Sequence, residues 1–153
     1  MPDIVDKATR SRMMAGIRNK DTRPELSLRE ALHARGFRYR LHDSRLPGSP
    51  DLVFPKHRAV CFVHGCFWHR HPGCRYATTP ATRTDFWQAK FASNVARDKR
   101  NRQQLRQADW RIAIVWECSL RGKDLETTVT QISNWLASDS PTFSTDVSRE
   151  RQP

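Results

Sequence analysis

The chain has 153 residues, a length that suits one domain with a single hydrophobic core. Its 27 lysines and arginines outnumber its 16 acidic residues, and the formal net charge is +11. This excess indicates an acidic partner, and nucleic acid is the commonest one for a small basic protein. A basic surface that serves only solubility is the weaker alternative. Arginine outnumbers lysine here, and arginine is the better ligand for phosphates and bases.

The N-terminal sequence is charged and lacks the apolar segment of a signal peptide. No apolar run is long enough to cross a membrane. We therefore expect a cytoplasmic protein. In that compartment the four cysteines are expected to bind a metal or to be buried, rather than to form two disulfides.

The first expected elements are a basic arm and a helix. Residues 1–20 read as the arm, with partial helical character. The helix is expected to begin at "TRPE", where Thr22 can cap it and Pro24 suits its first turn. Glu25 lies three residues after the cap and can complete a capping box. Gly36 is expected to end the helix.

Short strands are expected next. "FRYRL" at 37–41 alternates like a strand, and "LVF" at 52–54 follows the turn-rich loop "LPGSPD". "AVCFV" at 59–63 is fully apolar, which predicts a buried strand. Cys61 lies inside that strand and is expected to be a core residue.

Helical character returns at Thr84, and its expected apolar side consists of Phe86, Trp87, Phe91 and Val95. A buried strand is expected at 110–117, followed by an amphipathic helix with Leu125, Val129, Ile132 and Leu136 at helical spacing. We expect one domain over 21–137 and a disordered tail over 138–153. This order of elements predicts an α/β fold, with one central sheet covered by helices on both faces.

Cysteine and histidine are concentrated in "HGCFWHRHPGC" at 64–74. Cys66, His71 and Cys74 lie in this stretch, and Cys118 follows a predicted buried strand. Three cysteines and one histidine make a closed tetrahedral zinc site of the structural kind. The alternative for Cys118 is a small buried residue with no metal role.

Other residues could serve catalysis. With four ligands assigned, His64 and His69 remain as candidate general bases. Asp51 in "SPDLVF", followed by a second buried strand, is similar to a metal-dependent nuclease core, in which an acid and groups on the next strand bind Mg²⁺. The second strand ends in Phe62-Val63-His64, where such cores usually have Glu-x-Lys. Asp51 as an ordinary loop residue therefore stays open.

Six motifs occur in the order of a known family: "DKATRSRMM", "LPGSPD", "HGCFWH", "PATRTDFW", "NVARDKR" and "WRIAIVWECSLRG". The chain resembles the very short patch repair (Vsr) endonucleases over roughly residues 3 to 137. These are bacterial nickases that act at T:G mismatches. The resemblance implies the restriction-endonuclease-like fold, a mixed sheet flanked by helices, which agrees with the α/β prediction.

The resemblance also implies roles for single residues. Asp51 resembles the Mg²⁺ ligand, helped by the backbone carbonyl of Val63. His69 resembles the general base that activates water, and Asp98 the carboxylate that orients it. Glu25 resembles an accessory acid near the metal, although its role as a helix cap stays open.

His64 is expected beside the metal, in contact with phosphate. Cys66, His71, Cys74 and Cys118 match the family's zinc ligands. This chain has one extra residue between His71 and Cys74, within Pro72-Gly73.

The family's DNA contacts map onto two regions. Phe67, Trp68 and Trp87 resemble the aromatic residues that intercalate at the mismatch from the major groove. Met14 resembles the residue inserted from the minor-groove side, although a packing role for Met14 or Trp87 stays open. The remaining expected contacts are to phosphates or groove edges, from Lys7, Arg10 and Arg12.

The resulting hypothesis is a Mg²⁺-dependent monomeric enzyme, stabilised by zinc, that nicks DNA 5′ to the mismatched T of a T:G pair. Two alternatives stay open, a nuclease or nickase for a matched target and a zinc-stabilised DNA-binding module without catalysis. The partner is mismatched double-stranded DNA, with other repair proteins as further candidates that the sequence does not decide.

Overall fold

The computed structural model describes residues 22–145. The expected basic arm, with Lys7, Arg10, Arg12 and Met14, lies outside these residues, and its DNA contacts stay predictions.

The described part of the chain is built around a mixed sheet of five strands in the order β1-β2-β3-β4-β5. Their bounds are β1 Arg40–Leu41, β2 Leu52–Phe54, β3 Ala59–His64, β4 Arg111–Trp116 and β5 Thr142–Ser144. The first three strands pair antiparallel, whereas β3 with β4 and β4 with β5 pair parallel. Parallel neighbours need long crossover connections, and each connection here contains a helix.

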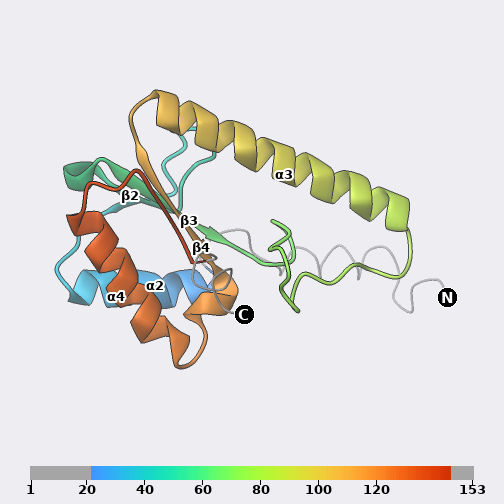
Figure 1. The fold of residues 1–153 in the computed structure, drawn as a ribbon, viewed down its shortest axis with the longest axis horizontal. Helices are drawn as coiled ribbons and strands as arrows, with labels where there is room; N and C mark the ends of the chain where they lie inside the picture. The colour runs from blue at the N-terminus through green and yellow to red at the C-terminus, as the bar shows by residue number, and fades with distance from the viewer. Residues whose placement is uncertain (1–21, 146–153) are drawn as a thin grey trace.

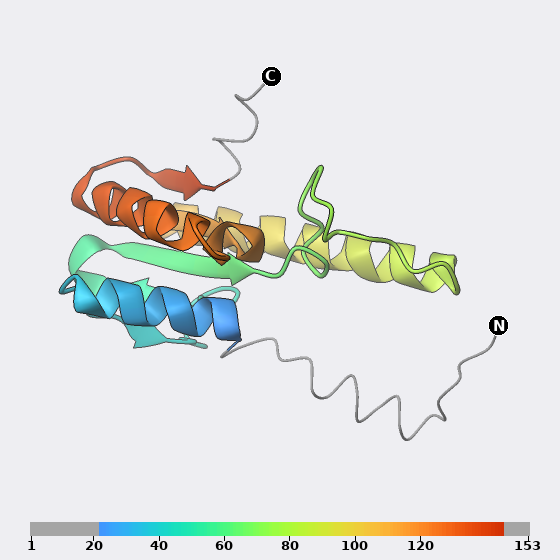
Figure 2. The same ribbon diagram turned by 90° about the horizontal axis from the view of Figure 1, so that it is seen from below.

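The helices cover both faces of this sheet. They are α2 Arg23–Ala34, α3 Thr84–Gln107 and α4 Asp124–Ala137, with short 3₁₀ helices at η1 Pro55–His57 and η2 Glu117–Leu120. Helices α2 and α4 lie on one face and α3 lies on the other (Figures 1 and 2). The predicted α/β architecture is confirmed at this level. None of the described helices has the length and hydrophobicity needed to cross a membrane.

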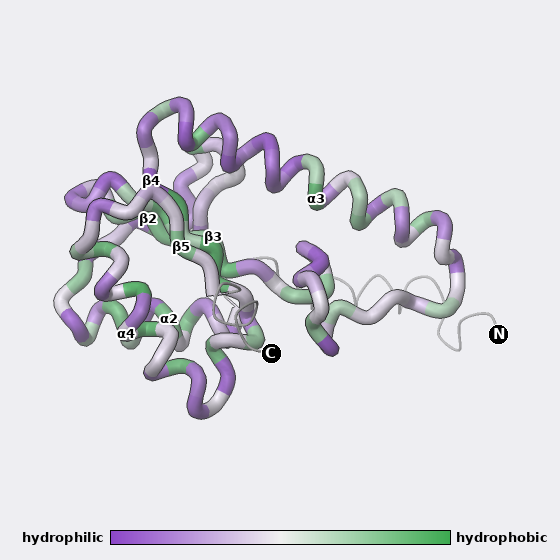
Figure 3. The backbone as a smooth tube through the Cα atoms, viewed as in Figure 1, coloured by the Kyte–Doolittle hydropathy of each residue, from purple (hydrophilic) through white to green (hydrophobic). Residues whose placement is uncertain are grey.

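Two hydrophobic clusters hold these layers together. Leu28 and Leu32 of α2 and Ile132 of α4 pack on one face of the sheet, around Cys61, which is fully buried as expected. On the other face, Leu105 of α3 packs against the central strands. The residues of β3 are accordingly strongly hydrophobic, whereas those of α3 are largely hydrophilic (Figure 3).

The predicted limits of the first helix agree with the structure. The Thr22 hydroxyl accepts a hydrogen bond from the Glu25 N–H at 3.4 Å, which caps α2. Gly36 follows the helix with a φ of +95°, a left-handed conformation that suits glycine.

Two segments differ from expectation. Of 37–41, only Arg40 and Leu41 form a strand, because the partner strand β2 ends at Phe54 and η1 begins directly after it. The rings of Phe37 and Tyr39 instead pack edge-on against Phe54, at 6.3 and 5.8 Å between centroids. The prediction of disorder from residue 138 onward is wrong for residues 142–144. They form β5, which pairs with β4 and places Phe143 against Trp135, at 6.1 Å between ring centroids.

The prediction of which residues form the apolar side of the long helix is also partly wrong. Phe91 is buried, but the side chains of Phe86 and Val95 are 49% and 44% exposed. In Figure 1 the N-terminal half of α3 extends beyond the sheet, so the described strands do not cover it.

Gly48, in the loop that leads to Asp51, fits closely against α3. Its φ is +79°, and an added Cβ would lie 2.9 Å from the Asn101 Nδ2 atom. We expect Gly48→Ala to lower the free energy of unfolding by about 1–3 kcal/mol in urea titrations, through backbone strain and the contact with Asn101. Gly122→Ala is the control, because Gly122 also has a positive φ but nothing lies within 4 Å of its added Cβ. Equal losses for both variants would show that Asn101 moves aside without cost.

Candidate active site and metal centre

The candidate site lies where β3 ends. Asp51 directly precedes β2, and the antiparallel register with β3 brings it beside the last residues of that strand. Its Oδ2 atom accepts a hydrogen bond from the Val63 N–H at 2.7 Å. The carboxylate is thereby fixed at the same end of the sheet as His64 and the loop that follows it.

A first cluster consists of Asp51, Glu25 and His42, whose ligand atoms all lie within 4.8 Å of one another. His42 Nε2 is 3.0 Å from Glu25 Oε2, and His42 Nδ1 is 3.5 Å from Asp51 Oδ1. Glu25 also forms an ion pair with Arg29, one turn further along α2. The buried carboxylate of Glu25 thus faces Asp51, which favours the accessory acid over a role restricted to helix capping.

His42 was missed by the sequence analysis, although the antiparallel register could have found it. Arg40 pairs with Val53 and Leu41 with Leu52, so His42 comes next, opposite Asp51. Its N–H donates to the Asp51 carbonyl at 3.1 Å, and its φ of +47° turns the chain there.

Burial raises the pKa of Asp51 to about 7, and the charge of Glu25 contributes in the same direction. The hydrogen bond from the Val63 N–H and the Arg29 guanidinium lower it, but burial outweighs them. Two buried carboxylates with hard oxygen donors fit a Mg²⁺ ion, which prefers such ligands. Asp51 contacts the N–H of Val63 and not its carbonyl. The role of the Val63 carbonyl as a Mg²⁺ ligand therefore stays a prediction.

We expect divalent-metal binding to weaken by about tenfold for each pH unit below about 7, because a proton on Asp51 must leave before the metal binds. Above that pH the affinity should level off. Titration with Mn²⁺, following the free ion by electron paramagnetic resonance from pH 5.5 to 8.5, measures this dependence. Asp51→Asn is the control. A parent affinity that stays constant over this range would contradict the prediction.

A second cluster contains His64, His69 and Asp98. His69 lies in the loop after β3, and its Nδ1 atom is 2.6 Å from Asp98 Oδ2 of α3. A carboxylate that accepts from Nδ1–H leaves Nε2 as the proton acceptor. The predicted base and its orienting carboxylate are therefore in hydrogen-bond contact.

His64 stacks on His69, with ring centroids 3.9 Å apart and planes 4° from parallel. Lone pairs of two stacked imidazoles lie in parallel planes and do not converge on one ion, so this geometry disfavours a metal shared by His64 and His69. Burial lowers the pKa of His64 well below its usual value, and repulsion from His69 and Arg102 adds to the effect. His64 is therefore neutral at physiological pH.

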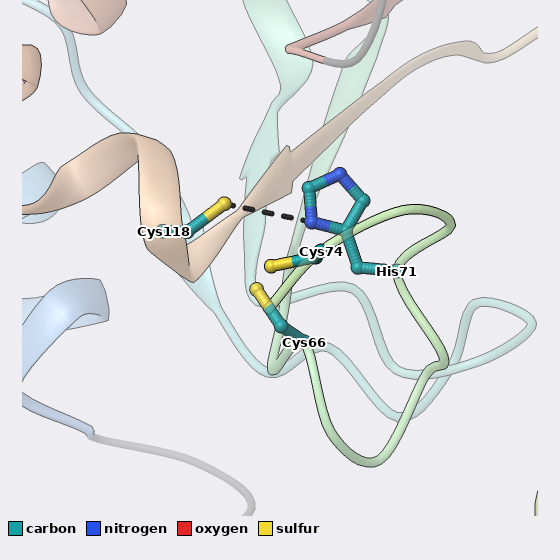
Figure 4. A group of neighbouring side chains, drawn as sticks. All are labelled: Cys66, His71, Cys74 and Cys118. Atoms are coloured by element: carbon teal, nitrogen blue, oxygen red, sulfur yellow. Dashed lines mark hydrogen bonds between the residues drawn. The ribbon is translucent and has the colours of Figure 1, made fainter. Parts of the chain in front are cut away.

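The four predicted zinc ligands come together at one point. Cys66, His71 and Cys74 lie in the loop after β3, Cys118 lies in η2, and all four side chains point inward (Figure 4). Their ligand atoms are within 4.8 Å of one another, and Cys118 Sγ is 3.5 Å from His71 Nδ1. This set of thiols and an imidazole fits a closed zinc site, which would pin the loop to the sheet.

Two further features concern the surroundings of this cluster, the stacking of His71 and the burial of Cys66. The His71 ring stacks on Trp116 of β4, with centroids 4.3 Å apart and planes 7° from parallel, which fixes its orientation. Burial raises the pKa of the Cys66 thiol well above its usual value. A bound cation would favour the thiolate and offset this cost.

We expect Cys118→Ser to lower the zinc content from roughly one ion per chain and to reduce the melting temperature, because a structural zinc contributes directly to folding. Metal analysis and thermal unfolding measure both effects. Cys61→Ser, in the core and away from the cluster, is the control: it should lose stability while retaining zinc. Unchanged zinc content in Cys118→Ser would make Cys118 a packing residue.

An aromatic cluster of Phe67, Trp68, Trp87 and Phe91 joins the same loop to α3. Phe67 lies 4.9 Å from Trp68 and 5.8 Å from Trp87, measured between ring centroids. Phe91 is buried beneath them, 5.2 Å from Phe67. The three residues predicted to intercalate thus form one continuous group, with Phe67, Trp68 and Trp87 partly exposed.

Two polar residues that the sequence analysis missed hold this cluster. The Arg70 guanidinium lies 3.9 Å from the centre of the Phe91 ring and donates to the carbonyls of Phe67 and Thr78, at 3.2 and 2.8 Å. The buried Asn94 side chain donates to the Trp68 carbonyl at 3.1 Å. Asn94 begins the motif "NVARDKR" and Arg70 lies within "HGCFWHRHPGC", but their contacts with the aromatic cluster exist only in the folded chain.

Comparison with known proteins agrees with this geometry. Residues 2–75 match the family model described as DNA mismatch endonuclease Vsr. The chain is 42% identical over 149 residues to the DNA mismatch endonuclease Vsr of Escherichia coli K12, which covers 95% of each chain. The chain belongs to the Vsr family. The family prediction is confirmed, and with it the prediction of a DNA endonuclease.

Other relatives in this family are named type II nicking enzymes. V.XorIIP of Xanthomonas oryzae pv. oryzae is 48% identical over 120 residues, covering 78% of this chain and 88% of the relative. V.NmeAIP of Neisseria meningitidis is 42% identical over 123 residues, covering 80% and 87%.

Proposed function

We propose that this protein is a Mg²⁺-dependent endonuclease that nicks duplex DNA 5′ to the mismatched T of a T:G pair and so initiates very short patch repair. The carrying observation is the contact between His69 and Asp98 at 2.6 Å, on the loop that also holds Phe67 and Trp68. One loop therefore combines a general base with a surface able to detect a weakened base pair.

In this proposal Asp51 holds the Mg²⁺ with the Val63 carbonyl, and Glu25 lies beside them. Bound there, the ion would supply positive charge to the scissile phosphate and lower the pKa of a water. His69 Nε2 accepts the proton of the attacking water. Asp98 fixes the ring and stabilises the charge that His69 gains.

His64 is proposed to contact the phosphate and to keep His69 in place through their stacked rings. Because His64 is neutral, it places no fixed positive charge against the imidazolium that forms at His69.

Recognition is assigned to the aromatic cluster. A mismatched pair stacks poorly, so opening the helix there costs less than opening a matched pair. Phe67, Trp68 and Trp87 would then stack on the exposed bases. Met14 is proposed to insert from the minor-groove side, while Lys7, Arg10 and Arg12 contact phosphates.

We further propose a restriction-endonuclease-like fold, a structural zinc at Cys66, His71, Cys74 and Cys118, and a cytoplasmic monomer. The mixed sheet with helices on both faces and the convergence of the four ligands support the first two. Other repair proteins are proposed as further partners, which would bind in addition to DNA.

Nicking of end-labelled duplexes with T:G or T:A in varied flanking sequences, with Mg²⁺, tests the proposal. We expect one nick, 5′ to the T, in the T:G duplex only. Equal cleavage of T:A would favour a nickase for a matched target. A zinc-loaded protein that binds these duplexes but cleaves none would favour a DNA-binding module.

A further inference from the structure

A groove of about 750 Å³ lies between the C-terminal half of α3 and the strands β4 and β5. Lys99, Arg102 and Arg106 line it from α3, while Ile112, Ile114 and Thr142 line it from the sheet. Leu105 of α3 packs in one cluster with Val60 of β3 and Ile112 of β4, and the groove lies beside this contact, along β4 and β5.

The charge of the groove points to an anion. None of its lining residues is acidic, and each polar side chain among them can donate a hydrogen bond. Arg106 donates to the Trp110 carbonyl at 3.0 Å. Within residues 22–145, no carboxylate pairs with Lys99, Arg102 or Arg106.

The spacing of the cations suits a phosphodiester backbone. Lys99, Arg102 and Arg106 are three and four residues apart, so they follow one side of α3 over a rise of about 10 Å. One DNA strand presents a phosphate about every 3.4 Å along the helix axis. Where α3 lies along the DNA axis, the row is therefore long enough to face about three phosphates.

The groove is also continuous with the pocket of the catalytic histidine. Arg102, Ile114 and Ser144 line both the groove and a neighbouring pocket of about 350 Å³, which contains His69 and Asp98. A strand whose phosphate lies at His69 can therefore continue directly between α3 and β5.

We propose that this groove binds the backbone of the DNA strand as it leaves the catalytic pocket, through Lys99, Arg102 and Arg106. The inference rests on the proposed function, because it places the scissile phosphate at His69. Continuity with that pocket favours DNA over the alternative occupant, an acidic segment of a partner protein.

The test removes the three cations together as Lys99→Gln, Arg102→Gln and Arg106→Gln. The matched control removes three exposed cations that do not line the groove, as Arg38→Gln, Lys56→Gln and Lys123→Gln. Affinity for a T:G duplex is measured over a range of KCl concentrations. We expect the slope of log K against log salt to fall by about 2 to 3 in the groove variant, at about 0.9 per lost phosphate contact, and by less than about 1 in the control. Melting temperature and zinc content verify that both variants fold.

Shortening one arm of the duplex at a time makes the test directional. The groove leaves the catalytic pocket on one side. Removing one arm should therefore abolish the difference in salt slope between the parent chain and the groove variant. Removing the other arm should preserve that difference.

An unchanged salt slope in the groove variant would overturn the proposal and leave the groove to an acidic protein segment. A reduced slope that persists with either arm removed would also overturn it, because the cations would then act as a diffuse field. Failure of the proposed function shows separately, as a parent chain with no preference for T:G over T:A. The groove is then judged on whichever duplex binds.

Discussion

Asp51→Asn is expected to reduce the rate of nicking by at least about 10³-fold while DNA binding stays close to that of the parent chain. The change removes the buried anionic ligand of the proposed Mg²⁺ site but retains the side-chain volume and the nearby aromatic cluster. Charge stabilisation by a bound metal contributes several kcal/mol to the transition state, and each 1.36 kcal/mol is a factor of ten in rate. Single-turnover nicking and equilibrium binding of a T:G duplex measure the two effects.

Asp43→Asn is the matched control. Asp43 is close in sequence but forms an ion pair with the exposed Arg45, whose guanidinium lowers the pKa of Asp43 to about 2. It is outside both carboxylate clusters, so nicking should be nearly unchanged. Near-normal nicking by Asp51→Asn would mean that the catalytic metal binds elsewhere.

Trp68→Ala and His69→Ala are expected to have opposite phenotypes although the residues are neighbours. Loss of base stacking at Trp68 should cost roughly 1–3 kcal/mol of binding, mainly in the preference for T:G over T:A. His69→Ala should preserve mismatch binding and lower the rate of nicking by at least roughly 10²-fold, the effect of a lost general base. Binding to both duplexes and single-turnover nicking, measured for each variant, separate recognition from chemistry.

Trp110→Ala is the control for loss of an indole. Trp110 precedes β4 at the end opposite the site, where it lies against Arg58. Its loss should reduce stability without changing discrimination. If Trp68→Ala left discrimination intact and slowed nicking as much as His69→Ala, Trp68 would be a packing residue that positions the base.

The sequence by itself determined the family and the set of candidate metal-binding residues. Candidate ligands can be predicted from residue type, because thiols and imidazoles are common metal ligands whatever the fold. The cap at Thr22, the stop at Gly36 and the buried strand around Cys61 were also predictable, since they depend on local geometry and hydrophobicity.

Only the tertiary structure decided which groups meet. His42 faces Asp51 because β1 pairs with β2 in one register, and the carboxylate of Glu25 joins them because α2 packs across the sheet. Arg70 and Asn94 hold the aromatic cluster through contacts between a loop and α3. Phe86 was expected to be buried and is exposed, because periodicity marks one side of a helix but does not show where its covering layer ends. For the same reason, the sequence did not predict β5 or the groove beside it. Strand pairing and the gap left by a helix depend on long-range packing, whereas residue type and local spacing are written in the sequence.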